Sequence, residues 1–372
     1  MRYYMVAGER SGDLHGSNLV KAIRKQEPQA VFKGFGGDDM QQAGVAISVH
    51  YREMAFMGFV SLAFSLFKIF RYVRFCKKDI LEFKPDAIIL IDYGGFNLKM
   101  ALWAKANGFK VFYYIPPKVW AWYQSRAIKL KANTHRIFVI LPFEKDFFRK
   151  YNCEVDYVGN PVLDAIKAFQ PNNQFLDTYS VVPDRKIVAL LPGSRKIELK
   201  RIVPLMVEIV VRNPQVQFAV AVVSNLPEAL YKPLANKPNV IFVREATYDL
   251  LTHAHAAIVT SGTATLETGI FKIPQVVVYK TSLVEYLIAK WLVKVEFISL
   301  VNLIANKEVI RELIQNNAKT EIVNAELNRL LNDEMYVTTM KEGYSRVYQI
   351  LDTGSASENT ATLILKYLNK KG

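Results

Sequence analysis

Short apolar runs that alternate with longer amphipathic segments constrain the fold of this chain most strongly. One series of strand-like runs covers residues 3–7, 30–35, 87–91, 110–115, 136–140 and 155–158, and a second covers 186–191, 216–223, 240–243, 256–260 and 275–279. Apolar strands separated by helices are typical of parallel sheets with helices on both faces. The pattern therefore predicts an α/β chain with parallel sheets, and after about residue 308 it predicts only helices.

The length and one break in the pattern predict two domains. A chain of 372 residues exceeds a typical single core, and residues 170–185 are rich in Pro, Asn, Asp and Ser. We predict Rossmann-like domains over residues 1–170 and 186–345, a linker over 171–185 and C-terminal helices over 346–372. Two such domains form a cleft, and ligands of parallel sheets bind outside the carboxyl ends of the strands.

Charge and cysteine content narrow the class of partner. The formal net charge of +14 favours anionic partners such as phosphorylated substrates or a lipid surface. We expect no nucleic acid, because no zinc finger, RNA-binding aromatic motif or basic tail is recognisable. Cys76 and Cys153 fit neither a disulfide framework nor a metal site, and the five histidines form no metal set. No signal peptide is visible. A reducing compartment is therefore expected.

The stretch 257–269 predicts a phosphate-binding turn. An apolar strand leads into Ser261 and Gly262, and a helix is expected to begin at about Thr263. The first N–H groups of a helix lack partners within it and favour an anion. Glu267, one turn later, is placed to accept hydrogen bonds from a ribose diol. The alternative is an ordinary strand-turn-helix with a capping hydroxyl.

Three other strand ends carry polar residues. The loop after the first strand contains Gly8, Glu9, Ser11 and Asp13, in a spacing that is not the NAD fingerprint. Asp92 ends an apolar strand, and partial burial there would make it a better general base. Gly193 and Ser194 offer backbone donors, and Arg195 offers a planar fork, for phosphate oxygens. For each, a capping residue or an ordinary surface side chain remains the alternative.

Residues 57–78 combine an apolar run with a basic helix. The run is too short to span a bilayer, but aromatic and cationic side chains at helical spacing suit a helix lying in a membrane interface. A helix packed on its own sheet with a solvated basic face is the alternative. Residues 286–294 form a second candidate. The predicted membrane contacts are Phe64, Phe67, Lys68, Phe70, Arg71 and Arg74.

An ordered set of motifs over most of the chain resembles the lipid-A-disaccharide synthase family. The motifs are Val6 to Asp13, Ala55 to Gly58, Ile91-Asp92 with Phe96-Asn97, Val119 to Trp122, Leu141 to Glu144, Val158 to Pro161, Leu190 to Arg195, Ser261 to Glu267 and Ser299 to Ala305. Relatives often carry a second acid where this chain has Gly95.

The resemblance implies an inverting glycosyltransferase of the GT-B type, with parallel Rossmann-like sheets facing across a cleft. Such an enzyme joins UDP-2,3-diacylglucosamine to 2,3-diacylglucosamine 1-phosphate and releases the β-1,6-linked disaccharide phosphate and UDP. Asp92 matches the catalytic base. Arg195, Ser261 to Thr263, Glu267 and Asn302 match positions around UDP, and Gly8, Glu9, Ser11 and Asp13 match a loop facing the cleft.

The resemblance further implies that no cofactor or metal is needed. It implies a peripheral enzyme on the cytoplasmic face of the inner membrane of a Gram-negative-type bacterium. The last helices are expected to cross back to the first domain or to be exchanged in a homodimer. Two alternatives remain: an isomerase similar to UDP-N-acetylglucosamine 2-epimerase, and a non-enzymatic peripheral protein that binds nucleotide sugars.

Overall fold

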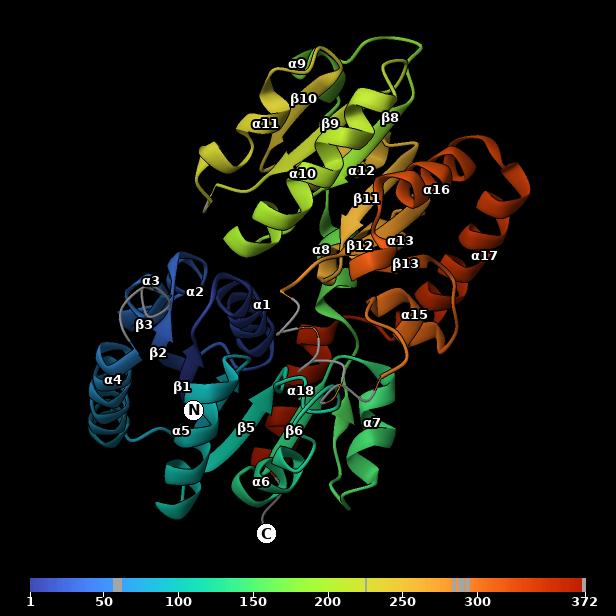
Figure 1. Cartoon of the computed structure of the whole chain (residues 1–372). Helices are drawn as coiled ribbons and strands as arrows, with labels where there is room; N and C mark the ends of the chain where they lie inside the picture. The colour runs from blue at the N-terminus through green and yellow to red at the C-terminus, as the bar shows by residue number, and fades with distance from the viewer. Residues whose placement is uncertain (56–61, 225, 283–285, 287–290, 292–294, 370–372) are drawn as a thin grey trace. The chain divides into compact units, whose positions relative to one another are not determined.

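The computed structural model of the chain describes residues 1–55, 62–224, 226–282, 286, 291 and 295–369. It contains two compact units, one made of Met1–Pro161 with Asp352–Gly372 and the other of Val162–Leu351. We refer to them as unit 1 and unit 2 (Figure 1). The domain boundaries predicted from the sequence were at residues 170 and 345.

Unit 1 is built on a parallel sheet of order β3-β2-β1-β4-β5-β6-β7. β1 and β4 lie at its centre, and their side chains are buried almost throughout because helices cover both faces. The strands are β1 (Arg2–Ala7), β2 (Val31–Gly36), β3 (Val45–His50), β4 (Ala87–Ile91), β5 (Lys110–Tyr114), β6 (Arg136–Val139) and β7 (Asp156–Tyr157). The helices are α1 (Arg10–Gln26), α2 (Asp38–Gln42), α3 (Tyr51–Ala55), α4 (Leu62–Phe83), α5 (Gly94–Ala106), α6 (Arg126–Asn133) and α7 (Pro142–Arg149).

The C-terminal helix α18 (Ala356–Asn369) packs against α1 in unit 1 (Figure 1). Ala361 and Ile364 join the core beside β1 and β2. At the rim, the Lys25 ammonium lies 2.6 Å from a carboxylate oxygen of Glu358. Unit 1 is thus assembled from the two ends of the chain.

Unit 2 is built on a second parallel sheet, of order β10-β9-β8-β11-β12-β13. Its strands are β8 (Ile187–Leu191), β9 (Gln217–Val222), β10 (Val240–Arg244), β11 (Ala256–Thr260), β12 (Gln275–Tyr279) and β13 (Arg311–Ile314). Its helices are α8 (Pro161–Ala168), α9 (Phe175–Thr178), α10 (Lys196–Arg212), α11 (Lys232–Ala235), α12 (Thr247–His253), α13 (Thr263–Ile270), α15 (Leu300–Ala305), α16 (Thr320–Asn332) and α17 (Glu334–Leu351). The two predicted parallel sheets are confirmed.

Two strands were missed by the sequence patterns, and both form an edge of their sheet. The expectation of only helices after residue 308 is wrong, because β13 pairs with β12 there. β3 likewise adds to the edge next to β2. An edge strand is buried on fewer sides and tolerates charged residues such as Arg311 and Glu312, so it lacks the continuous apolar run of a central strand.

The stretch predicted as a linker contributes to the core of unit 2. Phe175 on α9 is 1% exposed, and its ring stacks on His253 with centroids 5.1 Å apart. The polar residues around it had suggested a connection without structure. Phe175 anchors this segment together with Tyr179 and Val181, which pack against the same core.

Candidate active site

Asp92 occupies the carboxyl end of β4, at the centre of the unit 1 sheet. Both Asp92 and the next residue, Tyr93, have left-handed backbones with φ of 48°. This conformation is costly for residues other than glycine and is found at functional sites. Burial raises the pKa of the Asp92 carboxyl, while the Tyr93 backbone N–H and the positive charge of Lys118 oppose that rise. The combination suits a proton acceptor.

The strained turn at Asp92 is held by its carbonyl oxygen. That oxygen accepts hydrogen bonds from the Asn97 side-chain amide at 2.9 Å and from the Tyr113 hydroxyl at 2.8 Å. The fully buried Asn97 amide also approaches the carbonyl oxygens of Val6 at 3.3 Å and Ile91 at 3.2 Å. Asn97 therefore ties the ends of β1 and β4 together and fixes the backbone from which the Asp92 carboxyl projects.

The loop after β1 lies against this turn. A Cβ atom at Gly8 would come within 2.3 Å of the Tyr93 ring, so this close contact requires a glycine. Tyr93 has a raised pKa, caused mainly by burial and secondarily by the negative charge of Glu9. The structure thus brings Gly8 and Glu9 close to the Asp92 turn, and it leaves Ser11 exposed on the first turn of α1.

Asp13, predicted to face the cleft with this loop, instead caps α2. The side chain is 2% exposed, and its carboxylate accepts hydrogen bonds from the backbone N–H groups of Gly37 at 2.6 Å, Asp39 at 3.0 Å and Met40 at 3.1 Å. A carboxylate at a helix N-terminus satisfies the N–H groups that lack helical partners. We therefore correct the role of Asp13 to holding α2 beside α1.

Glu144 is a second buried carboxyl at the same edge of the sheet, and the sequence reasoning assigned it no role. It follows β6 and accepts hydrogen bonds from the backbone N–H groups of Leu141 at 2.9 Å and Ile140 at 3.2 Å. Burial raises its pKa to about 7, although these two N–H groups and the charge of Lys118 oppose the shift. The signal in the sequence was a glutamate three residues after Leu141, the residue that precedes α7, which resembles half of a capping box.

In unit 2, the predicted turn after β11 has the expected geometry. α13 begins at Thr263, and the Ser261 and Gly262 backbone leads into it from β11. The Ser261 hydroxyl donates to the carbonyl oxygen of Ile298 at 3.0 Å, so the turn is anchored from outside. Among the described residues, no carboxylate bonds the N–H groups of Gly262 or Thr263. This helix N-terminus can accept an anion.

Glu267 lies one turn into α13, half-buried, as expected. One of its carboxylate oxygens accepts a hydrogen bond from the Tyr248 hydroxyl at 3.0 Å. Burial raises the pKa of Glu267, and the Tyr248 hydrogen bond opposes that rise. Tyr248 is in turn held by Phe271 and Phe169, whose ring centroids lie 5.3 and 5.5 Å from its own. Glu267 is therefore a positioned acceptor suited to sugar hydroxyls.

The loop after β8 differs from the prediction. The carboxylate of Glu198 accepts hydrogen bonds from the backbone N–H groups of Ser194 at 2.9 Å and Arg195 at 3.1 Å. It therefore occupies the position expected for a phosphate. The exposed Arg195 side chain lies 3.1 Å from the same carboxylate. The loop offers an exposed guanidinium, and the backbone N–H of Ser194 is not available as predicted.

Asn302 also has a different environment from the one predicted around UDP. It is fully buried, and its side-chain nitrogen donates to the Ile310 carbonyl at 2.8 Å and to Glu312 at 2.9 Å. Its side-chain oxygen accepts from the N–H groups of Val309 and Ile310 at 2.8 and 3.0 Å. All four of these interactions stay within unit 2. These bonds give Asn302 a positioning role in unit 2, and its contact with UDP stays a prediction.

Glu312 on β13 connects this network to the turn after β11. Its carboxylate accepts from the backbone N–H groups of Ile298 and Ser299, at 2.8 and 2.9 Å. Because Ile298 in turn holds the Ser261 hydroxyl, a chain of hydrogen bonds runs from β13 to the predicted phosphate turn.

The basic helix α4 has one packed face and one exposed face. Tyr72, Cys76 and Asp79 are buried, and the Asp79 carboxylate accepts a hydrogen bond from the Tyr4 hydroxyl of β1 at 2.7 Å. Phe70 is 61% exposed, and Arg71 and Arg74 are exposed, whereas Lys68 is half-buried. Residues 57–61 and the side chains of Phe64 and Phe67 lie outside the described residues, as does most of 286–294. No helix in the described part of the chain is long and apolar enough to cross a membrane.

The described residues contain no group of three His, Cys, Asp or Glu side chains arranged to hold a metal. Two Rossmann-like units with polar groups at their strand ends give the chain the GT-B fold. A family model described as lipid-A-disaccharide synthetase matches residues 3–365. The chain belongs to the lipid-A-disaccharide synthase family and is an enzyme of that class.

Named relatives agree with this family. The chain is 40% identical over 373 residues to the lipid-A-disaccharide synthase of Syntrophus aciditrophicus, covering 98% of this chain and 97% of the relative. It is 37% identical over 376 residues to that of Geobacter metallireducens, covering 100% and 98%. It is 33% identical over 364 residues to that of Coxiella burnetii, covering 97% and 96%.

Solved structures share the fold at low identity. The UDP-GlcNAc 2-epimerase of Neisseria meningitidis, bound to UDP-GlcNAc, matches with a TM-score of 0.65 and 14% identity, covering 99% of each chain. The calicheamicin glycosyltransferase matches with a TM-score of 0.65 and 12% identity, covering 100% of this chain and 99% of its own. The epimerases are relatives in fold alone, whereas the synthases are relatives in sequence. Family membership therefore excludes the epimerase and non-enzymatic alternatives.

Proposed function

We propose that this enzyme transfers 2,3-diacylglucosamine from its UDP carrier to the 6-hydroxyl of 2,3-diacylglucosamine 1-phosphate. Membership of the synthase family supports these substrates. The observation that carries the mechanism is Asp92, a carboxyl with a raised pKa on a strained turn that Asn97 holds at the end of a central strand.

In the proposed reaction, the oxygen of the acceptor 6-hydroxyl attacks the anomeric carbon of the donor, while Asp92 takes the proton of that hydroxyl. The new carbon–oxygen bond forms as the bond to the UDP oxygen breaks, and attack from the opposite face converts an α-linked donor into a β-linked product. The departing diphosphate gains negative charge. The N-terminus of α13 and the guanidinium of Arg195 are suited to stabilise it, and Glu267 to hold the ribose.

UDP release tests the transferase directly. Purified enzyme in detergent micelles is given UDP-2,3-diacylglucosamine with and without 2,3-diacylglucosamine 1-phosphate. Acceptor-dependent release together with a disaccharide product supports the proposal. Release without acceptor indicates hydrolysis and contradicts it.

Variants at the base separate chemistry from folding. Asp92→Asn is expected to lower kcat by about 10²–10⁴-fold, the range for loss of a general base, whereas Asp146→Asn, at an exposed ion pair with Arg149, serves as the matched control. Lys118→Gln removes a charge that lowers the pKa of Asp92. It should therefore shift the acidic limb of the kcat/KM profile to higher pH. Near-normal turnover of Asp92→Asn would reject the assignment.

We further propose that the enzyme acts at the cytoplasmic face of the inner membrane, because both substrates carry acyl chains. The exposed Phe70, Arg71 and Arg74 on α4 support contact with an anionic interface. Replacing Phe64, Phe67 and Phe70 with Ser should weaken binding to anionic liposomes in a flotation assay. The matched control is Leu102→Ser, an exposed apolar residue on α5. Unchanged flotation of the triple variant would remove α4 from the membrane contact.

A further inference from the structure

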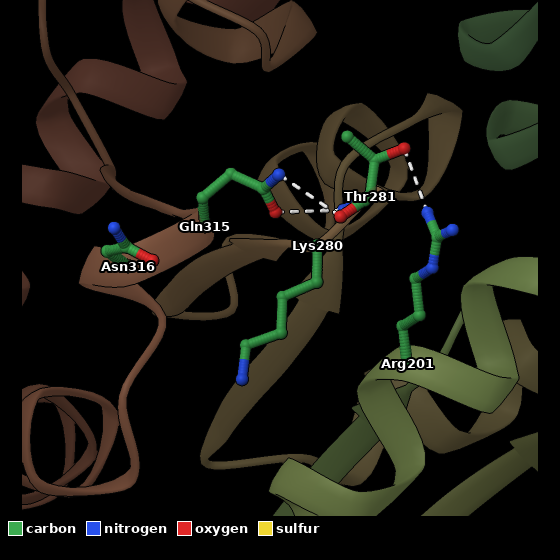
Figure 2. A pocket seen from close by; sticks show the side chains of 5 residues that line it. All are labelled: Arg201, Lys280, Thr281, Gln315 and Asn316. Carbon is green, nitrogen blue, oxygen red and sulfur yellow. Dashed lines mark hydrogen bonds between the residues drawn. The ribbon is translucent and has the colours of Figure 1, made fainter. Parts of the chain in front are cut away.

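A cavity of about 340 Å³ opens at the carboxyl ends of β12 and β13 in unit 2 (Figure 2). Lys280 and Thr281 follow β12, Gln315 and Asn316 follow β13, and Arg201 reaches the cavity from α10. Ligands of parallel sheets bind at this edge. Nothing in the sequence reasoning pointed to these residues, because none of them belongs to a recognised motif.

The walls of the cavity are fixed by hydrogen bonds within the protein. The Gln315 side-chain oxygen accepts from the Thr281 backbone N–H at 2.9 Å, and its side-chain nitrogen donates to the Thr281 carbonyl at 3.1 Å (Figure 2). An Arg201 N–H donates to the Thr281 hydroxyl at 2.9 Å, which orients the guanidinium. Gln315 has a left-handed backbone with φ of 52°, a conformation that costs energy and that this double contact maintains.

The charge of the cavity is positive. Arg201 and Lys280 line it, and the other three lining residues are an alcohol and two amides. Within the part of the chain that the structure describes, the half-buried Lys280 ammonium has neither a hydrogen bond nor an ion pair. In Figure 2 the Lys280 side chain extends away from the Gln315–Thr281 contact. A guanidinium, an ammonium and neutral amides together are the donor set of a phosphate site.

The size of the cavity points to more than a bare anion. A volume of about 340 Å³ exceeds that of a phosphate ion and lies at the lower end of the range for small-molecule sites. A phosphate ester with one small substituent fits this space better than inorganic phosphate.

The cavity is separate from the turn after β11 but lies next to it. The Ser261 N–H bonds the carbonyl of Val278, two residues before Lys280. A ligand in the cavity would therefore lie beside, and not on, the N-terminus of α13.

We propose that this cavity is a second phosphate-recognition site, which binds a phosphate ester through Lys280 and Arg201. Two sources share this chemistry: a sugar phosphate, in which the ester is a dianionic monoester, and the headgroup of an anionic phospholipid. The proposal does not depend on the transferase reaction, because binding is measured directly.

The first arm of the test uses α-D-glucose 1-phosphate and isothermal titration calorimetry on the full chain. Saturating UDP is present, so that the proposed nucleotide site is already filled. Lys280→Gln is expected to weaken binding at least tenfold. Lys307→Gln removes an exposed charge elsewhere in unit 2 and should leave the Kd unchanged. Arg201→Gln should also weaken binding, but Lys280→Gln carries the test because its side chain makes no contact on which folding depends.

The second arm measures flotation with phosphatidylglycerol vesicles. Loss of glucose 1-phosphate binding in Lys280→Gln supports the site with a sugar phosphate as its ligand. Loss of vesicle binding alone in Lys280→Gln, with Lys307→Gln unaffected, supports it with a lipid headgroup as its ligand. If neither ligand depends on Lys280, the proposal is overturned. UDP affinity, measured separately, reports on the nucleotide site, so the two assignments fail independently.

Discussion

Replacing Glu144 with Gln should abolish a specific dependence of stability on pH. The pKa of Glu144 is raised from its ordinary value of 4.5 to about 7 by burial. Because the folded state binds this proton more tightly than the unfolded state, the stabilisation is full below about pH 4.5 and is lost as the pH rises through about 7. The shift corresponds to about 3 kcal/mol, at about 1.4 kcal/mol for each pKa unit. Glu144→Gln is neutral at every pH and should show no such loss.

The measurement is the free energy of unfolding in urea at pH 5 and pH 8, followed by tryptophan fluorescence. Trp120 is buried next to this site, with its ring centroid 4.9 Å from that of Phe143, whereas Trp291 is 82% exposed and should change little. Between these two pH values, Glu144→Gln should gain about 2–3 kcal/mol relative to the unmodified enzyme.

Glu82→Gln, an exposed residue of α4 paired with Lys78, provides the control and should follow the unmodified enzyme. Parallel pH dependences for the enzyme and Glu144→Gln would refute the claim that this carboxyl is held in its neutral form.

Three further predictions concern the geometry of the site. Asn97→Ala leaves buried carbonyl oxygens without their donor, so it should lower the free energy of unfolding by about 1–3 kcal/mol. It should also reduce kcat more than it changes KM. Loss of stability with unchanged kcat would limit Asn97 to a structural role. Gly8→Ala introduces a Cβ within 2.3 Å of an aromatic ring and should lower the free energy of unfolding in urea by about 1–3 kcal/mol. Gly95→Ala, where a Cβ would have nothing within 4 Å, should lower it far less. Equal effects of the two substitutions would contradict the packing argument. Tyr248→Phe removes the donor to Glu267 and should weaken UDP binding by about 5- to 10-fold in calorimetry, so an unchanged Kd would separate Glu267 from the nucleotide.

The sequence predicted the central strands because burial on both faces leaves a continuous apolar run. β4 and β11 are each buried along their whole length, and the sequence identified both correctly. β3 and β13 were missed because an edge strand has one neighbour fewer and carries polar residues. The other two edge strands, β7 and β10, were predicted, so the visibility of a strand in sequence depends on how continuous its apolar run is.

The same reasoning located the strand ends but could not assign partners to their polar side chains. Asp92 and Asp13 both follow apolar strands of unit 1 and are equally plausible as catalytic carboxylates from spacing alone. In the structure, Asp13 is bonded to three backbone N–H groups of α2, whereas Asp92 projects from a strained turn. The N–H groups that Asp13 binds lie 24 to 27 residues further along the chain, a separation that no local pattern reveals.

Two neighbouring helix N-termini in unit 2 show how an internal carboxylate determines which one is available to a ligand. β8 and β11 are paired in the sheet, and each leads into a helix, α10 or α13. Just before α10, Glu198 already binds the N–H groups of Ser194 and Arg195, so a diphosphate there would meet a carboxylate. At α13, the acidic residue is Glu267, one turn further in and held by Tyr248. The phosphates are therefore expected at α13, where the N–H dipoles are available. Arg195 would then bind the diphosphate through its exposed guanidinium and not through its backbone. To do so, the guanidinium would exchange its ion pair with Glu198 for one with the diphosphate. The guanidinium is 75% exposed in this pair, so water screens its charge and the exchange is inexpensive.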